Sequence, residues 1–309
     1  MRVEAKVSAS RLRAARARFE SCFDGQASPW IYDALRVGLA LVFLVRHADW
    51  LRPWLTLEHH KSVHGLLFYE SAPMAPVLRS PWLVGAALST GVTRALIVLR
   101  TALSFTLLLG VRARLSAALL GGVSLALVAA DRYRYFHHLF LLYVALLWLS
   151  LAPIGERFTW RQALAWARRH FGGADAKPLR VNPPAAWPLQ LLRALTLSVY
   201  AAAGFSKLNA SWLRGDALRD LELVCLLDGR AWELLRNLLG YSGIAWLACT
   251  FELAVCLLLC IPITRRAAVL AGMGFHAGIS ACMPVFSFGA QMSVLLLSFL
   301  SERKLPKSS

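Results

Sequence analysis

Long apolar stretches run through almost all of this 309-residue chain, and they limit its fold more than any other feature of the sequence. A helix that crosses a bilayer needs about 20 mostly apolar residues, so several of the stretches suit tilted or partial crossings. We predict an all-α, polytopic integral membrane helical bundle with about eight transmembrane helices. The apolar stretches are residues 30–46, 94–111, 115–130, 136–153, 187–206, 243–263, 267–285 and 287–301.

Composition supports this class of protein. Hydrophobic residues make up 58% of the chain and charged residues 17%, whereas a soluble domain has roughly 45–50% and about 25%. These proportions exclude a soluble globular protein, a disordered chain and a disulfide-bonded secreted domain. We therefore divide the chain into a basic cytoplasmic segment at 1–29, a transmembrane domain at 30–301 and a cytoplasmic tail at 302–309.

The net charge of +17 comes from basic residues that lie between the apolar stretches. A nucleic-acid-binding protein would gather them in one patch or stripe, so nucleic acid is not a predicted partner. If the N-terminus is inside, the inner connections carry 19 Lys and Arg residues and the outer ones carry 10. By the positive-inside rule, this bias predicts both termini in the cytoplasm. The outer face then gathers the loop 50–93, the start of 136–153 and the end of 187–206.

Lys207 is the most informative residue, because it follows an apolar stretch in the segment Tyr200-Ala-Ala-Ala-Gly-Phe-Ser-Lys207. Helical spacing places Tyr200, Gly204 and Lys207 on one face, and the small residues let a neighbouring helix approach closely. A lysine on such a face loses solvation, which favours a neutral amine that can accept a proton. The alternative is a lysine that marks the helix end and extends to the lipid headgroups.

Histidines supply further candidates on the same predicted side. His137 and His138 open the stretch 136–153, where imidazole near a lysine would bind an anionic oxygen or transfer protons. The alternative is an interfacial pair within an aromatic belt. His276 and Glu252 lie inside later apolar stretches, and intramembrane ionisable residues are functional candidates by default. A neutral histidine that is hydrogen-bonded across helices is the structural alternative for His276.

Other polar and ionisable residues have simpler interpretations. Glu58, His59, His60 and His64 cluster in one loop, which we interpret as a solvated or lid segment rather than a metal site. The chain has only eight histidines, and membrane di-iron enzymes need many more. The six cysteines form no CxxC pair and are predicted to be buried, inert thiols. Arg36 and Arg193 are expected to extend to the headgroups, and Arg100 to pair internally.

Three segments, taken in order, resemble the HTTM (horizontally transferred transmembrane) domain family, which shares its membrane unit with vitamin K-dependent gamma-carboxylases. The segment from Val199 to Gly215 resembles the family's lysine motif, with Lys207 as the motif lysine. Gly110-Val-Arg-Ala-Arg-Leu and then residues 131–138 resemble the histidine region. His138 stands at the motif histidine, and His137 stands where the family usually has asparagine. Phe275-His276, after Phe251-Glu252, resembles the family's later Phe-His segment.

The resemblance implies a chemistry. In the carboxylases the motif lysine deprotonates reduced vitamin K, which reacts with dioxygen to give an epoxide. The strongly basic intermediate then removes a proton from a peptide glutamate, and carbon dioxide adds. By resemblance, Lys207 would be the base and His138 would assist the oxygenated intermediate. His276 and Tyr200 would line the pocket, with His137 and Trp212 as further substrate-binding residues.

The expected cofactor is therefore a reduced vitamin K or menaquinone-type hydroquinone in a bacterial inner membrane, at a site that faces the exterior or periplasm. The chain ends at Ser309 without the large extramembrane domain that binds peptides in the carboxylases. We therefore expect hydroquinone oxidation rather than peptide carboxylation, unless a partner protein supplies that domain. The alternative is a non-enzymatic membrane protein that binds a lipid, a quinone or a partner subunit.

Overall fold

Every predicted apolar stretch forms a helix in the computed structural model of the protein. The structure describes residues 27–55, 90–130, 137–156, 158–165, 184–283 and 285–300. The long helices are α2 (Pro29–Leu55), α5 (Thr90–Leu109), α6 (Ala113–Ala130), α7 (His137–Ser150), α9 (Trp187–Ser206), α12 (Arg230–Cys260), α13 (Arg265–Cys282) and α14 (Phe286–Leu296), which η3 (Leu297–Leu300) continues. Two short helices, α10 (Ala210–Leu213) and α11 (Asp216–Leu223), lie within a connection that the sequence predicted as polar. The all-α class is confirmed for the described residues.

Helix α12 has the length and composition of a membrane span. Among the described helices, it alone is long and apolar enough by these measures to cross a bilayer, with 31 residues. Shorter apolar helices cover Val98–Leu109, Ala113–Ala126, Leu139–Ser150 and Ser287–Leu300. Many large apolar side chains on the helix surfaces are exposed, among them Leu257 and Leu270, as expected for a protein surrounded by lipid. One helix of span length is therefore established, and the count of about eight spans stays a prediction.

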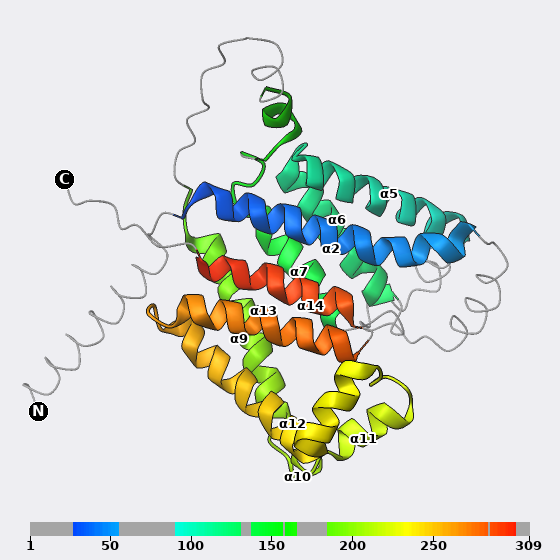
Figure 1. Ribbon diagram of the computed structural model, residues 1–309. Helices are drawn as coiled ribbons and strands as arrows, with labels where there is room; N and C mark the ends of the chain where they lie inside the picture. The colour runs from blue at the N-terminus through cyan, green and yellow to red at the C-terminus, as the bar shows by residue number, and fades with distance from the viewer. Residues whose placement is uncertain are drawn as a thin grey trace, which may run out of the picture.

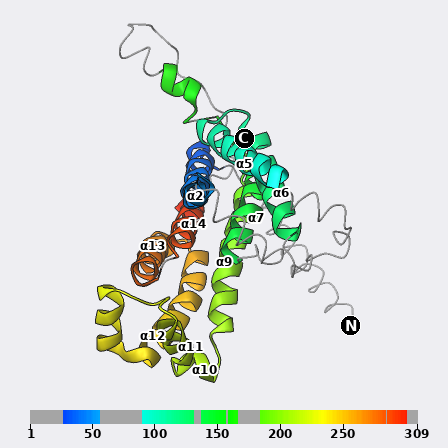
Figure 2. The same ribbon diagram turned by 90° about the vertical axis from the view of Figure 1, so that its right-hand side faces the viewer.

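The long helices pack in a closed circuit. Each packs on the next in the order α2, α14, α13, α12, α9, α7, α6 and α5, and α5 returns to α2. In Figures 1 and 2, α2, α14 and α13 lie in one row, with α7 and α9 behind them. Further contacts, such as those of α14 with α9 and of α2 with α7, cross the circuit and fill its interior. The main core is therefore shared by helices from both halves of the chain.

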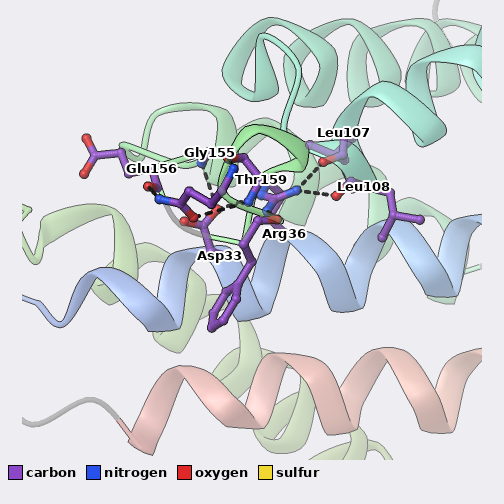
Figure 3. Close-up of polar contacts among 9 residues, drawn as sticks. Asp33, Arg36, Leu107, Leu108, Gly155, Glu156 and Thr159 are labelled. Atoms are coloured by element: carbon purple, nitrogen blue, oxygen red, sulfur yellow. Dashed lines mark hydrogen bonds and ion pairs between the residues drawn. The ribbon is translucent and has the colours of Figure 1, made fainter. Parts of the chain in front are cut away.

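A buried ion pair between Asp33 and Arg36 of α2 joins this helix to the end of α5 and to the connection after α7. Both side chains are fully buried, and Arg36 Nε lies 2.7 Å from Asp33 Oδ1. The Arg36 guanidinium also donates to the carbonyls of Leu107, Leu108 and Phe158, at 2.5, 2.7 and 2.9 Å (Figure 3). A charged group so deep must be paired and hydrogen-bonded, and Arg36 donates four hydrogen bonds here, one of them to its ion-pair partner Asp33. The prediction that Arg36 extends to the headgroups is therefore wrong.

Two other arginines, in the apolar helices α9 and α5, are also held inside the bundle. Arg193 donates through Nε and a terminal nitrogen to the carbonyl of Ser298, at 2.9 and 2.8 Å, which joins the start of α9 to the end of the α14–η3 segment. It does not extend to the headgroups, because that carbonyl lies within reach. Arg100 donates to Tyr143 Oη at 3.0 Å and lies over the Phe43 ring, so the predicted internal pairing is confirmed.

Gly204 lets α9 approach α12 closely. A Cβ atom at this position would lie 2.6 Å from Leu253 Cδ2 and 2.7 Å from Leu253 Cγ, so a larger side chain would push the helices apart. We expect Gly204→Val to lower the free energy of unfolding by about 1–3 kcal/mol relative to Gly274→Val, since overpacking has this typical cost. Gly274 is a matched control because it is also helical and has open space around it. Equal denaturation midpoints of the two variants in detergent would contradict the close approach.

The chain forms a separate small lobe where α12 begins. Gly240 has a φ of 65° and breaks α12 into two parts, because this backbone conformation is accessible mainly to glycine. Residues 210–239, here called the α11 lobe, comprise α10, α11 and the first part of α12. The lobe has its own core, formed by Leu218, Leu227 and Trp232 with Ile244 and Ala245 of the second part of α12. Figures 1 and 2 both place it at the side of the bundle away from α5.

Polar contacts of Glu222 stabilise the α11 lobe. Its carboxylate accepts hydrogen bonds from Tyr241 Oη and from the Arg236 guanidinium. The Tyr241 hydrogen bond, followed by smaller contributions that include the Arg236 charge, lowers the pKa of Glu222 below its ordinary value. A lowered pKa in the folded state means that the stabilisation is complete above the ordinary pKa and is lost as the pH falls through the lowered one.

We therefore expect the wild-type α11 lobe to be better protected than that of Glu222→Gln at pH 7, and the difference to vanish at strongly acidic pH. Hydrogen exchange of residues 216–239, corrected for intrinsic rates, measures this difference. A difference that is the same at both pH values would contradict a role for the ionised carboxylate.

Candidate functional site

Lys207 follows the last residue of α9 and points towards α12. Its Nζ lies 2.8 and 2.6 Å from the two carboxylate oxygens of Glu252, and 3.4 Å from the carbonyl of Ala203. The Lys207 side chain is 18% exposed and that of Glu252 is 9% exposed. The amine is therefore mostly buried and paired, yet it keeps a small opening to the outside. The sequence predicted that the helix face with Lys207 is buried, and Lys207 is mostly buried. The side chain points to Glu252, so the alternative of a lysine that extends to the headgroups does not apply.

The ion pair depends on how α9 and α12 meet. Gly204, one turn before Lys207, packs on Leu253, the neighbour of Glu252, so α9 and α12 approach each other closely where the two charges lie. Two opposite charges in an apolar environment are stabilised by pairing and are costly when separated. This arrangement can take up and pass on a proton.

Tyr200 and His276 form a second polar contact in the same region. Tyr200 lies seven residues before Lys207 on α9, and its Oη is 2.8 Å from Nε2 of His276 on α13. Both side chains are buried. The His276 ring is also in edge contact with Phe275 and Phe288. The hydrogen bond across helices that was the structural alternative for His276 is therefore present.

Trp212 covers Lys207 from the α10 side. The Lys207 amine lies 5.2 Å from the centre of the Trp212 ring, within the range of a cation–π contact. The indole Nε1 donates to the carbonyl of Ala245 at 3.4 Å, which fixes the ring against α12. Asn209 caps α10 by accepting a hydrogen bond from the backbone N–H of Trp212. The lysine motif thus forms a compact turn that brings its tryptophan back to its lysine.

The side chains of the remaining predicted site residues lie outside the described part of the chain. Helix α7 begins at His137, but the side chains of His137 and His138 are not among the described residues. The loop with Glu58, His59, His60 and His64 also lies outside them. Within the described ranges, no group of three or more His, Cys, Asp or Glu residues could hold a metal ion.

Glu252 is the residue whose role the sequence did not identify. It was predicted as a functional candidate by itself, without a partner. The signal was available, because Lys207 and Glu252 are isolated opposite charges in two apolar segments, and such charges usually pair. The sequence could not tell that α9 and α12 are neighbours, because a connection of more than 20 residues separates them.

Comparison with known families identifies the chain. The model of the HTTM domain matches residues 84–302, about 70% of the chain, and this range contains Lys207, Glu252, Tyr200 and His276. The protein belongs to the HTTM domain family, which confirms the resemblance noted in its sequence, and membership supports a membrane protein. Neither a curated protein nor a solved structure matches the chain.

Proposed function

We propose that this HTTM-domain protein is a polytopic membrane protein of about eight spans that oxidises a lipid-soluble hydroquinone of the vitamin K or menaquinone type. The observation that carries the proposal is the Lys207 amine, which is mostly buried, paired with Glu252 and still partly accessible. Its position in the lysine motif is the one that the resemblance to the carboxylases implies for the base.

The residues around Lys207 fit a hydroquinone. A phenolic O–H needs a proton acceptor, which the amine supplies, and an aromatic ring packs well on the Trp212 face. Exposed apolar side chains of Phe205 and Leu208 border the lysine, as suits a ligand that arrives from lipid. A bound hydroquinone would supply the phenolic proton and the electrons that reduce dioxygen, with one oxygen atom entering the epoxide product and the other leaving as water.

In this proposal Lys207 removes the phenolic proton, and Glu252 receives a proton from the amine over the 2.6 Å contact. His276 binds the ligand through Nδ1, which is buried and has no hydrogen-bond partner among the described residues. Tyr200 fixes the orientation of that imidazole by its contact with Nε2. From the start of α7, His138 assists the oxygenated ligand, and His137 contributes to its binding.

We further propose a bacterial inner-membrane location, with cytoplasmic termini and the Lys207 site at the exterior or periplasmic side. The excess of Lys and Arg in the connections at the opposite end supports this orientation. The proposal covers hydroquinone oxidation and not peptide carboxylation. In the carboxylases an extramembrane domain binds the peptide, and a partner protein with such a domain would extend the chemistry to peptides.

The proposal is tested with purified protein in lipid nanodiscs, given reduced menaquinone and dioxygen. We expect menaquinone epoxide to form, as measured by liquid chromatography and mass spectrometry, and to be lost in Lys207→Ala. Arg214→Ala is the control, because this exposed residue pairs only with neighbouring Asp216 in the contacts described here. Epoxide formation that is unchanged in Lys207→Ala, or absent in the wild type, would overturn the proposal.

A non-enzymatic role is the second candidate, and the Lys207–Glu252 contact favours it. An amine that is held by both oxygens of a carboxylate is also well suited to a purely structural pair. The protein would then bind a lipid, a quinone or a partner subunit without turnover. Saturable binding of menaquinone in the same nanodiscs, with no epoxide formed, would select this function over the first.

A further inference from the structure

The α11 lobe carries an apolar surface that the proposed chemistry does not use. Leu223, Leu234 and Leu238 are 80%, 71% and 75% exposed. Val224 and Leu226 are exposed as well. Leu234 and Leu238 are one helical turn apart and share a face, whereas Trp232 points into the core of the lobe. Such a concentration of exposed leucine in one small unit marks an interaction surface.

The lobe is amphipathic, because it carries charged groups as well as exposed leucines, and several of the charged groups are held in contacts. Glu222 is bound by Arg236 and Tyr241, and Asp216 lies 2.9 Å from Arg214. The Arg219 guanidinium lies over the Tyr241 ring at 5.2 Å. The contacts of Glu222 and Arg219 hold α11 against both parts of α12, and the leucines stay on the outside. An apolar face on one side and fixed charges elsewhere are typical of elements that lie in a membrane interface.

The helix of span length also exposes large apolar side chains. Beyond the kink at Gly240, α12 exposes Trp246, Leu247 and Leu257, which a membrane span presents to lipid. The lobe also packs on the end of α13, where the backbone N–H of Asp228 donates to the carbonyl of Cys282 at 3.1 Å. The lobe therefore lies level with the ends of neighbouring helices, at the side of the bundle (Figures 1 and 2). This is the depth of the headgroups when α12 crosses the bilayer.

We infer that the α11 lobe lies in the interfacial layer of the bilayer, with Leu223, Leu234 and Leu238 inserted among the upper acyl chains. The partner is a lipid surface, because Leu234 and Leu238 lie on α12, the helix that has the length and composition of a membrane span and exposes further large apolar side chains. A soluble protein or a second copy of this chain would have to cover a face that borders directly on lipid. The inference concerns membrane contact and does not depend on hydroquinone chemistry at Lys207.

Spin-label accessibility tests the inference in proteoliposomes of phosphatidylcholine and phosphatidylglycerol. Labels are placed on single cysteines at positions 223, 234 and 238 of the full chain, in a background without the native cysteines. Leu257→Cys on α12 is the lipid-facing reference. Arg161→Cys is the aqueous reference, because this exposed residue lies in a polar connection outside the lobe. A further sample keeps the exposed native Cys225 as its single cysteine, so that one position of the lobe is labelled without a new substitution there.

We expect the ratio of oxygen to nickel-complex accessibility at 223, 234 and 238 to be several-fold higher than at 161 and close to that at 257. Ratios equal to that at position 161 would place the lobe in water and overturn the inference. Ratios that change with protein density in the liposomes would instead indicate contact between copies of the chain, and would also overturn it.

Discussion

Lys207→Arg is expected to lose 10²–10⁴-fold of the epoxide-forming rate, about the contribution of a general base. Arginine keeps the positive charge and can still pair with Glu252, but its guanidinium does not deprotonate in proteins. The variant therefore separates the charge of the lysine from its ability to accept a proton. The measurement is the initial rate of menaquinone epoxide formation in nanodiscs, with reduced menaquinone and dioxygen both saturating.

Glu252→Gln tests the same site from its other side. The amide keeps the shape of the side chain, but it cannot receive the proton that Lys207 passes on. We expect a reduced rate together with a changed pH dependence, whereas a purely structural pair would lower the amount of folded protein without moving the pH profile. Unaltered rates in Lys207→Arg would show that the lysine acts through its charge alone, and would refute its role as a base.

Asp33→Ala is expected to destabilise the protein by about 3–5 kcal/mol, since removing one partner of a buried ion pair leaves the other charge without compensation. Arg36 would remain fully buried, and the backbone N–H of Gly155, which donates to Asp33 Oδ1 at 2.8 Å, would also lose its acceptor. The measurement is the free energy of unfolding in mixed micelles with increasing SDS. Asp33→Asn retains an acceptor and should cost less.

Asp216→Ala is the matched control for Asp33→Ala, because it removes an aspartate from an ion pair whose arginine is 67% exposed. Exposed pairs contribute only about 0–1 kcal/mol, because water and side-chain entropy offset the attraction. If the two alanine variants unfold at the same SDS fraction, the buried Asp33–Arg36 pair does not stabilise the bundle more than an exposed pair does, and the prediction is wrong.

Much of the fold could be predicted from the sequence, because hydrophobicity and helix formation are local properties. All eight apolar stretches are helical, and the burial of the face that contains Tyr200 and Gly204 followed from spacing alone. The helices within residues 207–242 were not predicted, since their amphipathic pattern is short and mixed with charges. The kink at Gly240 was not predicted either, because a glycine in a helical pattern does not reveal its φ angle.

The partners of the buried charges could not be predicted, because they depend on which helices become neighbours. Arg36 satisfies carbonyls that lie 71 and 72 positions further along the chain, at the end of α5. The expectation that it reaches the headgroups assumed that no closer acceptors existed. For Lys207, the local motif indicated a buried amine, but the identity of the carboxylate depended on the packing of α9 on α12.

The carbonyls that Arg36 binds have a consequence for how the chain matures. The last turn of any helix leaves carbonyl oxygens without partners in that helix, and those of Leu107 and Leu108 are satisfied by a side chain from α2. Helix α2 lies before residue 84, where the family match begins. The unit that folds therefore includes a helix that precedes the matched residues. Because α2 precedes α5 in the chain, Arg36 has already been synthesised when the carbonyls at the end of α5 are made.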